Sequence, residues 1–200
     1  HFHSYTRTRR PMIWSSDQQP RSYVPPMSAP LFLLAVFTAL FAFVSPSFAS
    51  IWLKTGKETS RPYGHVEYCT RNASDCRSRS ASSKLPSSQL ALLRKVNVSV
   101  NRAIEAVDDK GDCEDYALAK RAKLMAKGFK PSQLLLTMGY AKGIAHTVLV
   151  VRTRDGDFVL DNLYNDVKPV SSAPMSFRKI QAPEDGARWL QVTGKTNKTP

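Results

Sequence analysis

The stretch KGDCEDYA, residues 110–117, places one cysteine among three carboxylates at the predicted start of a helix. Asp112 is a suitable N-cap and Gly128 marks the far end, so the pattern predicts a helix that begins at Cys113 and stops near residue 127. The free N–H groups and the positive pole of such a helix end lower the pKa of a thiol and can hold an oxyanion. Cys113 is therefore our candidate nucleophile.

The charges beside the cysteine admit two interpretations. Asp112, Glu114 and Asp115 are negative, and like charges oppose the formation of a thiolate. A bound cation would remove this conflict, and calcium suits the hard oxygen ligands on offer. Alternatively, the carboxylates only cap the helix and complement its dipole. The residues themselves leave both interpretations open.

Two predicted strands follow the cysteine helix, one beginning with His146 and one ending near Asp161. The turn between them is predicted at residues 153–156. A loop of even length puts both side chains on one face, and the four-residue loop puts Asp161 opposite Val148 and diagonal to His146. An odd loop would separate the two side chains. With Cys113 at the helix start, this pair predicts a thiol active site.

The remaining elements complete an α+β fold in which the cysteine helix packs on an antiparallel sheet. Apolar residues at every third or fourth position predict an amphipathic helix at 88–107, capped by Ser87 or Ser88. We interpret this helix as core packing without chemistry. Further predicted segments are a strand at 134–138, a polar loop at 139–143 and an edge strand at 189–192.

The first 49 residues are predicted to be a signal peptide with an N-terminal extension. The apolar run from Leu31 to Val44 is short for a bilayer span, and small residues follow it, with cleavage expected near Ala49. An uncleaved membrane anchor is the alternative. We expect an exported, periplasmic protein with no stable membrane insertion after cleavage.

Residues 50–86 are polar and rich in serine, and we predict a loosely structured arm there. Cys69 and Cys76 lie in this arm, and an oxidising compartment would join them in a disulfide, leaving Cys113 unpaired. Two free thiols are the alternative, whereas zinc is disfavoured because we expect no histidine close to the pair. The layout that follows is a catalytic domain at 87–193 and a flexible tail at 194–200.

Composition and charge bound the class of protein. Two hundred residues with 42% hydrophobic content suit one modest domain. The formal net charge of +13 favours encounters with anionic partners. Lys and Arg do not form runs interleaved with aromatic residues, so we do not expect nucleic-acid binding.

Three sequence blocks, GDCEDYA (111–117), HTVL (146–149) and FVLDNL (158–163), occur in the order and spacing of a known family. The chain resembles the bacterial transglutaminase-like cysteine proteinases, the LapG-type periplasmic proteases, from about residue 62 to about residue 190. The resemblance implies a papain-like, transglutaminase-type core.

The resemblance also implies roles for single residues. Cys113 matches the nucleophile, His146 the general base and then acid, and Asp161 the residue that orients the imidazole. Asp112 and Glu114 match the calcium-binding acidic pair of the family, which favours the cation over simple capping.

A substrate and a partner follow from the same resemblance. Proteases of this kind cut large surface adhesins near the adhesin N-terminal region, often after an Ala-Ala pair, and so release the biofilm anchor. In the best-known systems a membrane receptor that senses cyclic di-GMP sequesters the protease. The resemblance therefore implies a periplasmic endopeptidase with an adhesin substrate.

One departure from the family pattern concerns residues 107–110. They join the predicted helix directly to the Gly-Asp-Cys motif, where family members carry a longer connection with Tyr and Trp. Loss of a cleft wall here would favour a catalytically silent binding module. A transglutaminase- or amidase-type acyl transferase is the enzymatic alternative, since hydrolysis and transfer share an acyl-enzyme.

Overall fold

The computed structural model describes residues 50–82, 84–105 and 112–200. The predicted signal peptide at 1–49 and the short connection at 107–110 lie outside these residues and stay predictions. In the part of the chain that the structure describes, no helix is both long enough and apolar enough to cross a membrane.

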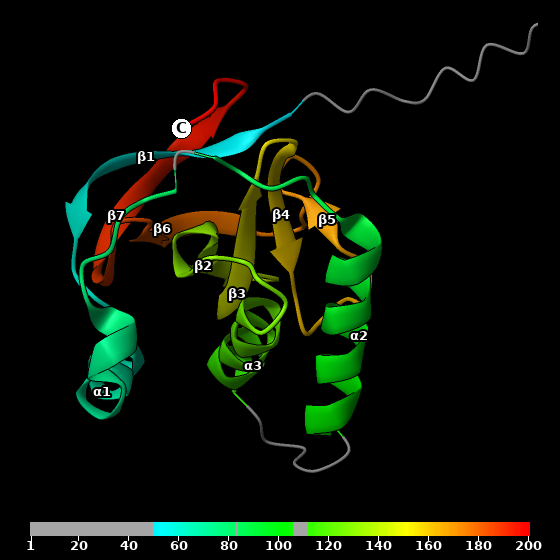
Figure 1. The fold of residues 1–200 in the computed structure, drawn as a ribbon, viewed down its shortest axis with the longest axis horizontal. Coiled ribbons are helices and arrows are strands. Elements are labelled where there is room, and N and C mark those ends of the chain that lie inside the picture. Colours follow the sequence, from blue (N-terminus) through cyan, green and yellow to red (C-terminus); the bar gives the residue numbers. More distant parts are fainter. Residues whose placement is uncertain (1–49, 83, 106–111) are drawn as a thin grey trace, which may run out of the picture. The chain divides into compact units, whose positions relative to one another are not determined.

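Seven antiparallel strands of the described residues form one sheet, in the order β1-β7-β6-β2-β3-β4-β5 (Figure 1). Their bounds are β1 Trp52–Thr59, β2 Leu134–Ala141, β3 Ile144–Thr153, β4 Gly156–Leu160, β5 Lys168–Pro169, β6 Ser176–Ala182 and β7 Asp185–Thr196. The sheet curls, because the start of β1 returns to the β3–β4 hairpin. There Asp157 N donates to Ile51 O at 2.8 Å, and the Asp157 carboxylate accepts from Leu53 N at 2.9 Å.

Helices cover one face of this sheet. Their bounds are α1 Tyr63–Arg71, α2 Leu90–Glu105 and α3 Cys113–Met125, with short 3-10 turns η1 at Ala73–Cys76 and η2 at Pro131–Gln133. Helices α2 and α3 lie side by side, and α3 packs on β3 (Figure 1). The α+β class with the cysteine helix on an antiparallel sheet is confirmed.

Two apolar clusters hold the central strands from both sides. Leu134 and Leu136 of β2 pack with α2 and α3, whereas Leu135 between them packs inside the curl of the sheet with Val148 and Val150. Successive side chains of a strand point to opposite faces, so a strand covered on both sides must be apolar throughout. This accounts for the unbroken apolar runs in β2 and β3.

The predicted polar loop at 139–143 was wrong in extent. Strand β2 continues to Ala141, and only Lys142 and Gly143 form the turn into β3, with φ of 50° and 80°. Gly139 lies inside the strand because β6 approaches closely: a Cβ at this position would stand 2.0 Å from Ser176 O. A glycine that suggests a loop in the sequence thus serves a close backbone contact.

The predicted loose arm at 50–86 contains strand β1, and the predicted flexible tail at 194–200 begins inside strand β7, which ends at Thr196. Strand β1 pairs with β7 along most of its length, from Trp52 opposite Thr196 to Thr59 opposite Trp189. Residues 50–86 are therefore not a loose arm, and β7 is an internal strand rather than the edge. Only Trp52 and Leu53 of β1 are buried, so its polar composition conceals a paired strand.

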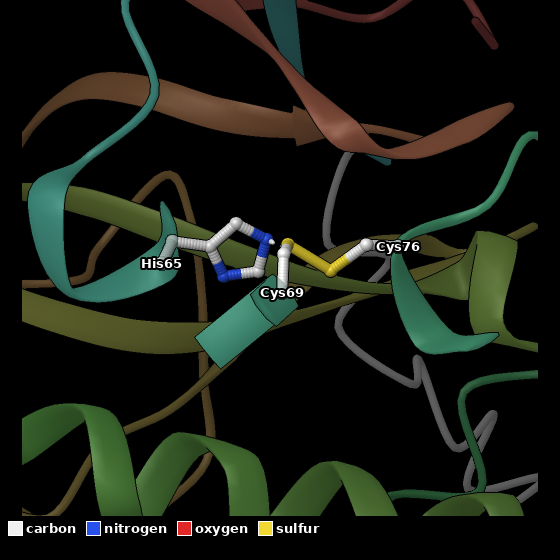
Figure 2. Close-up of side chains that lie close together, drawn as sticks. All are labelled: His65, Cys69 and Cys76. Carbon is white, nitrogen blue, oxygen red and sulfur yellow. Dashed lines mark hydrogen bonds between the residues drawn. A yellow bond between two sulfur atoms is a disulfide. The ribbon is translucent and has the colours of Figure 1, made fainter. Parts of the chain in front are cut away.

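Helix α1 and turn η1 are held on the domain by covalent and ionic links. The predicted disulfide between Cys69 and Cys76 is present and joins them (Figure 2). Next to it, Asp75 forms an ion pair with Arg121 of α3, whose side chain is 2% exposed. The predicted arm is thus anchored to the helix that begins with the candidate nucleophile.

Candidate active site

Cys113 is the first residue of α3, as the sequence predicts. Asp112 is the N-cap and forms a capping box with Asp115, whose carboxylate accepts from Asp112 N at 3.3 Å. The sulfur is partly buried and is not in a disulfide, and Thr147 N of β3 donates to it at 3.3 Å. Helix α3 and strand β3 therefore place the thiol of Cys113 beside Thr147, the neighbour of His146 in the chain.

His146 and Asp161 contact each other directly. His146 Nε2 lies 2.7 Å from Asp161 Oδ1, and both side chains are nearly buried. The hairpin pairs Thr153 with Gly156, so its turn has two residues rather than the predicted four. Both lengths are even, and the register still carries Asp161 to the position opposite Val148. With Nε2 engaged by the carboxylate, Nδ1 remains for the thiol.

The protonation of the pair favours a thiolate and an imidazolium. Burial acts to raise the pKa of Cys113, but hydrogen bonds from His146 and Thr147 outweigh it and the pKa is lowered. Burial acts to lower the pKa of His146, but the contacts with Asp161 and Cys113 outweigh it and raise the pKa to about 9. Both shifts favour the charged pair that a thiol nucleophile requires.

Two asparagines of α2 hold the segment that carries Asp161. Asn101 Nδ2 donates to Asp161 O at 3.1 Å, and Asn97 Nδ2 donates to Tyr164 O at 2.8 Å. Both side chains are buried, and Leu163 N adds a bond of 2.9 Å to Asp161 Oδ1. The sequence analysis assigned this helix no chemistry. The signal was two asparagines four residues apart on an otherwise apolar face, where buried amides need partners.

The three acidic residues beside the cysteine occupy two kinds of position. Asp112 and Asp115 serve the helix cap, whereas Glu114 is half-buried and points to α1, with Oε1 at 3.9 Å from His65 Nδ1. Burial raises the pKa of Glu114, and the charges of Asp115 and Asp112 add to the rise. One carboxylate of the three therefore stays outside the cap in an unfavourable electrostatic position.

A histidine does lie beside the disulfide, contrary to the sequence analysis. Among the described residues, the one group of three or more histidine, cysteine or acidic side chains within reach of a single metal ion is His65, Cys69 and Cys76 (Figure 2). His65 Nε2 is 3.9 Å from Cys76 Sγ and 2.9 Å from Gly186 O. The two sulfurs are bonded to each other, so this group forms a covalent link rather than a zinc site.

A family model matches most of the chain. The model of the family described as bacterial transglutaminase-like cysteine proteinase matches residues 55–197, a range that includes most of the segment predicted as an arm. A search of curated proteins found no significant match.

Solved structures of LapG from Legionella pneumophila are also similar to the chain. The calcium-bound form is 24% identical over 50% of this chain and 67% of that chain, with a TM-score of 0.41. A second LapG structure is 26% identical over 49% and 66%, with a TM-score of 0.41. The EGTA-treated form is 25% identical over 50% and 65%, with a TM-score of 0.41. The matched part thus spans about two thirds of those chains.

Proposed function

The chain belongs to the bacterial transglutaminase-like cysteine proteinases, and we propose from this that Cys113, His146 and Asp161 are the catalytic triad of an endopeptidase. The observation that carries the proposal is the contact of 2.7 Å between His146 Nε2 and Asp161 Oδ1. This contact accompanies a lowered pKa of Cys113 and a raised pKa of His146. A thiol beside an imidazole that a carboxylate contacts is the arrangement expected of a thiol nucleophile.

The mechanism follows from these positions. The Cys113 thiolate attacks the carbonyl carbon of a peptide bond, and N–H groups at the start of α3 stabilise the oxyanion that forms. The His146 imidazolium gives its proton to the leaving amine, the C–N bond breaks and an acyl-enzyme remains. The now neutral His146 takes a proton from water, which attacks the thioester; the C–S bond breaks, the acid is released, and the thiolate and the imidazolium are restored. Asp161 keeps the ring oriented and stabilises its charged form throughout.

Thiol reactivity tests the nucleophile. The full chain, with its disulfide intact, is treated with iodoacetamide at pH 7, and the rate is compared with that of a free thiol. Cys113→Ala is the control for the labelled residue, and we expect His146→Ala to slow labelling at least tenfold because the thiolate loses its counter-charge. Labelling no faster than a free thiol, and indifferent to His146→Ala, would contradict the proposal.

Calcium is proposed as a cofactor held by Asp112 and Glu114. Carboxylate oxygens are donors that suit a hard cation, and half-buried Glu114, whose pKa is raised, lies beside the charges of Asp115 and Asp112. When bound, calcium would supply positive charge that offsets these carboxylates next to the thiolate. Asp112 retains its role as the helix cap, and Glu114 holds its position against α1.

Calcium addition to the chelated full chain tests this proposal without a substrate. At a concentration 100 times the dissociation constant, binding stabilises the folded state by about 2.7 kcal/mol. We expect a rise in melting temperature that Glu114→Gln weakens. Asp166→Asn, which removes an exposed carboxylate paired with Arg94, is the control. An unchanged melting temperature would refute the site.

The substrate, the location and the partner are proposed from the same family resemblance. We place the protease in the periplasm after signal-peptide cleavage, and the Cys69–Cys76 disulfide supports an oxidising compartment. The proposed substrate is a large surface adhesin whose cleavage controls biofilm attachment, and the proposed partner is an inner-membrane cyclic di-GMP receptor. Incubation of the protease with the N-terminal part of an adhesin from the same organism is the direct test. An uncut adhesin with an alkylatable Cys113 would refute the substrate and leave the triad standing.

A further inference from the structure

A buried histidine lies against the disulfide that joins α1 to η1 (Figure 2). His65 is 1% exposed and Cys69 is 8% exposed, whereas Cys76 is only partly buried. A ring nitrogen of His65 and the two sulfurs lie within 4.8 Å of one another. Imidazole nitrogen and thiolate sulfur are donors that suit Zn²⁺ and other thiophilic cations. The sulfurs cannot hold a metal while they are bonded to each other, so the oxidation state of the pair decides what this cluster can bind.

The hydrogen bonds around His65 allow its Nε2 to change from a donor to a metal ligand. Nε2 lies 2.9 Å from Gly186 O and 3.9 Å from Cys76 Sγ. The side-chain amide of Gln181 donates to the same Gly186 O at 2.6 Å. This carbonyl therefore keeps a donor when Nε2 loses its proton and presents its lone pair to a cation.

The other ring nitrogen of His65 can carry the proton. His65 Nδ1 is buried and makes no hydrogen bond within the described part of the chain, and it lies 3.9 Å from Glu114 Oε1. A metal-bound histidine usually directs its second N–H to a carboxylate or another acceptor, which fixes the tautomer. Glu114 is thus placed to support His65 as a ligand through Nε2.

Contacts other than the disulfide hold η1 against the rest of the domain. Tyr68 Oη of α1 donates to Asp75 Oδ2 of η1 at 2.6 Å, and the same carboxylate pairs with Arg121 of α3. After η1, Arg79 N donates to Glu184 O at 2.7 Å, between β6 and β7. The second cysteine of the pair therefore stays near the histidine when the S–S bond opens, and the three ligands remain in place.

We propose that reduction of the Cys69–Cys76 disulfide converts this cluster into a binding site for a thiophilic cation, of which Zn²⁺ is the representative. A dithiol reductant supplies two electrons and two protons, so the reductant becomes a disulfide and the two cysteines become thiols. Zn²⁺ then binds both sulfurs, which release their two protons, and His65 Nε2, whose proton moves to Nδ1. Three protein ligands leave the fourth position of a tetrahedral zinc to water. The site uses none of the proposed triad residues.

Zinc titration of the full chain as Cys113→Ser tests the inference, because this variant has no cysteine outside the pair. A metal-sensing dye reports the free zinc, and the oxidised protein is the reference for every other group. After reduction by a phosphine, we expect one additional zinc per chain, bound at least about tenfold more weakly in His65→Gln. Co²⁺ in place of Zn²⁺ should give a thiolate-to-cobalt charge-transfer band only after reduction. Glu67→Gln, which removes an exposed carboxylate of α1, is the control and should bind zinc normally.

The outcomes of this titration are distinct from those of the proposed function, since the nucleophile is absent and no substrate is used. No additional zinc after reduction, or equal binding by His65→Gln, would overturn the site. A melting curve accompanies each titration, because the disulfide also stabilises the fold. If the reduced protein unfolds, zinc should restore the melting transition, but not in His65→Gln. A reduced protein that stays unfolded with zinc would overturn the inference as well.

Discussion

Replacing Asp161 with asparagine tests the charge of the proposed triad with little change of shape. The amide can still accept from His146 Nε2, now 2.7 Å from Oδ1, but the negative charge is gone. That charge is part of what holds the pKa of His146 at about 9 rather than 6.5. We expect Asp161→Asn to lower the pKa of His146 by about one to two units, or roughly 1.4–2.7 kcal/mol.

The lower pKa of His146 in Asp161→Asn should appear in the pH dependence of thiol alkylation. The rate with iodoacetamide rises when the ion pair forms and again when the imidazolium loses its proton and leaves a plain thiolate. In the wild-type protein the second rise should lie near pH 9, the pKa of His146. In Asp161→Asn we expect it between about pH 7 and 8.

Stability should change with a definite sign. The pKa of His146 is raised on folding, so its contribution to stability is complete below the unfolded pKa and disappears as pH rises through about 9. Asp161→Asn should therefore lower the melting temperature most near pH 6, by about 3–8 °C. The two proteins should converge near pH 10.

The control for Asp161→Asn is the substitution of an exposed carboxylate. Asp166→Asn removes a carboxylate that is 65% exposed and pairs with Arg94 on the surface, so neither the alkylation profile nor the stability should change by more than a few tenths of a kcal/mol. An Asp161→Asn protein whose second alkylation step stays near pH 9 would refute the assignment of Asp161. A drop in stability that is equal at pH 6 and pH 10 would show that the carboxylate only packs.

Three further substitutions test other parts of the structure. Asn101→Ala should cost about 1–3 kcal/mol in urea unfolding and slow alkylation, because a buried carbonyl at the triad loses its donor; unchanged alkylation would remove this asparagine from the site. Replacing both Cys69 and Cys76 with serine should cost about 2 kcal/mol in the same assay, since a short closed loop is released, and a midpoint equal to wild type would contradict it. Gly139→Ala should cost about 1–3 kcal/mol, because the new Cβ would stand 2.0 Å from a backbone oxygen of β6; full stability would show that β6 moves freely.

The local features of the site were predictable from short stretches. The N-cap and helix start at Cys113 follow from side-chain chemistry within four residues, and the structure has them. The turn of the hairpin was predicted two residues too long. His146 and Asp161 still contact each other, because the shorter turn keeps the same strand register and the same side-chain direction. The buried face of α3 was harder to predict, since Lys120 and Arg121 lie in it beside apolar residues.

By itself, the sequence determined the cysteine helix and the two central strands, because these depend on periodicity and capping within a few residues. Only the tertiary structure decided that residues 50–86 complete the sheet. The pairing of β1 with β7 joins residues more than a hundred positions apart, and β1 buries just Trp52 and Leu53. A mostly polar strand of this kind has no hydrophobic periodicity from which it could be predicted. Its backbone makes the hydrogen bonds, and the strand it pairs with depends on the tertiary structure.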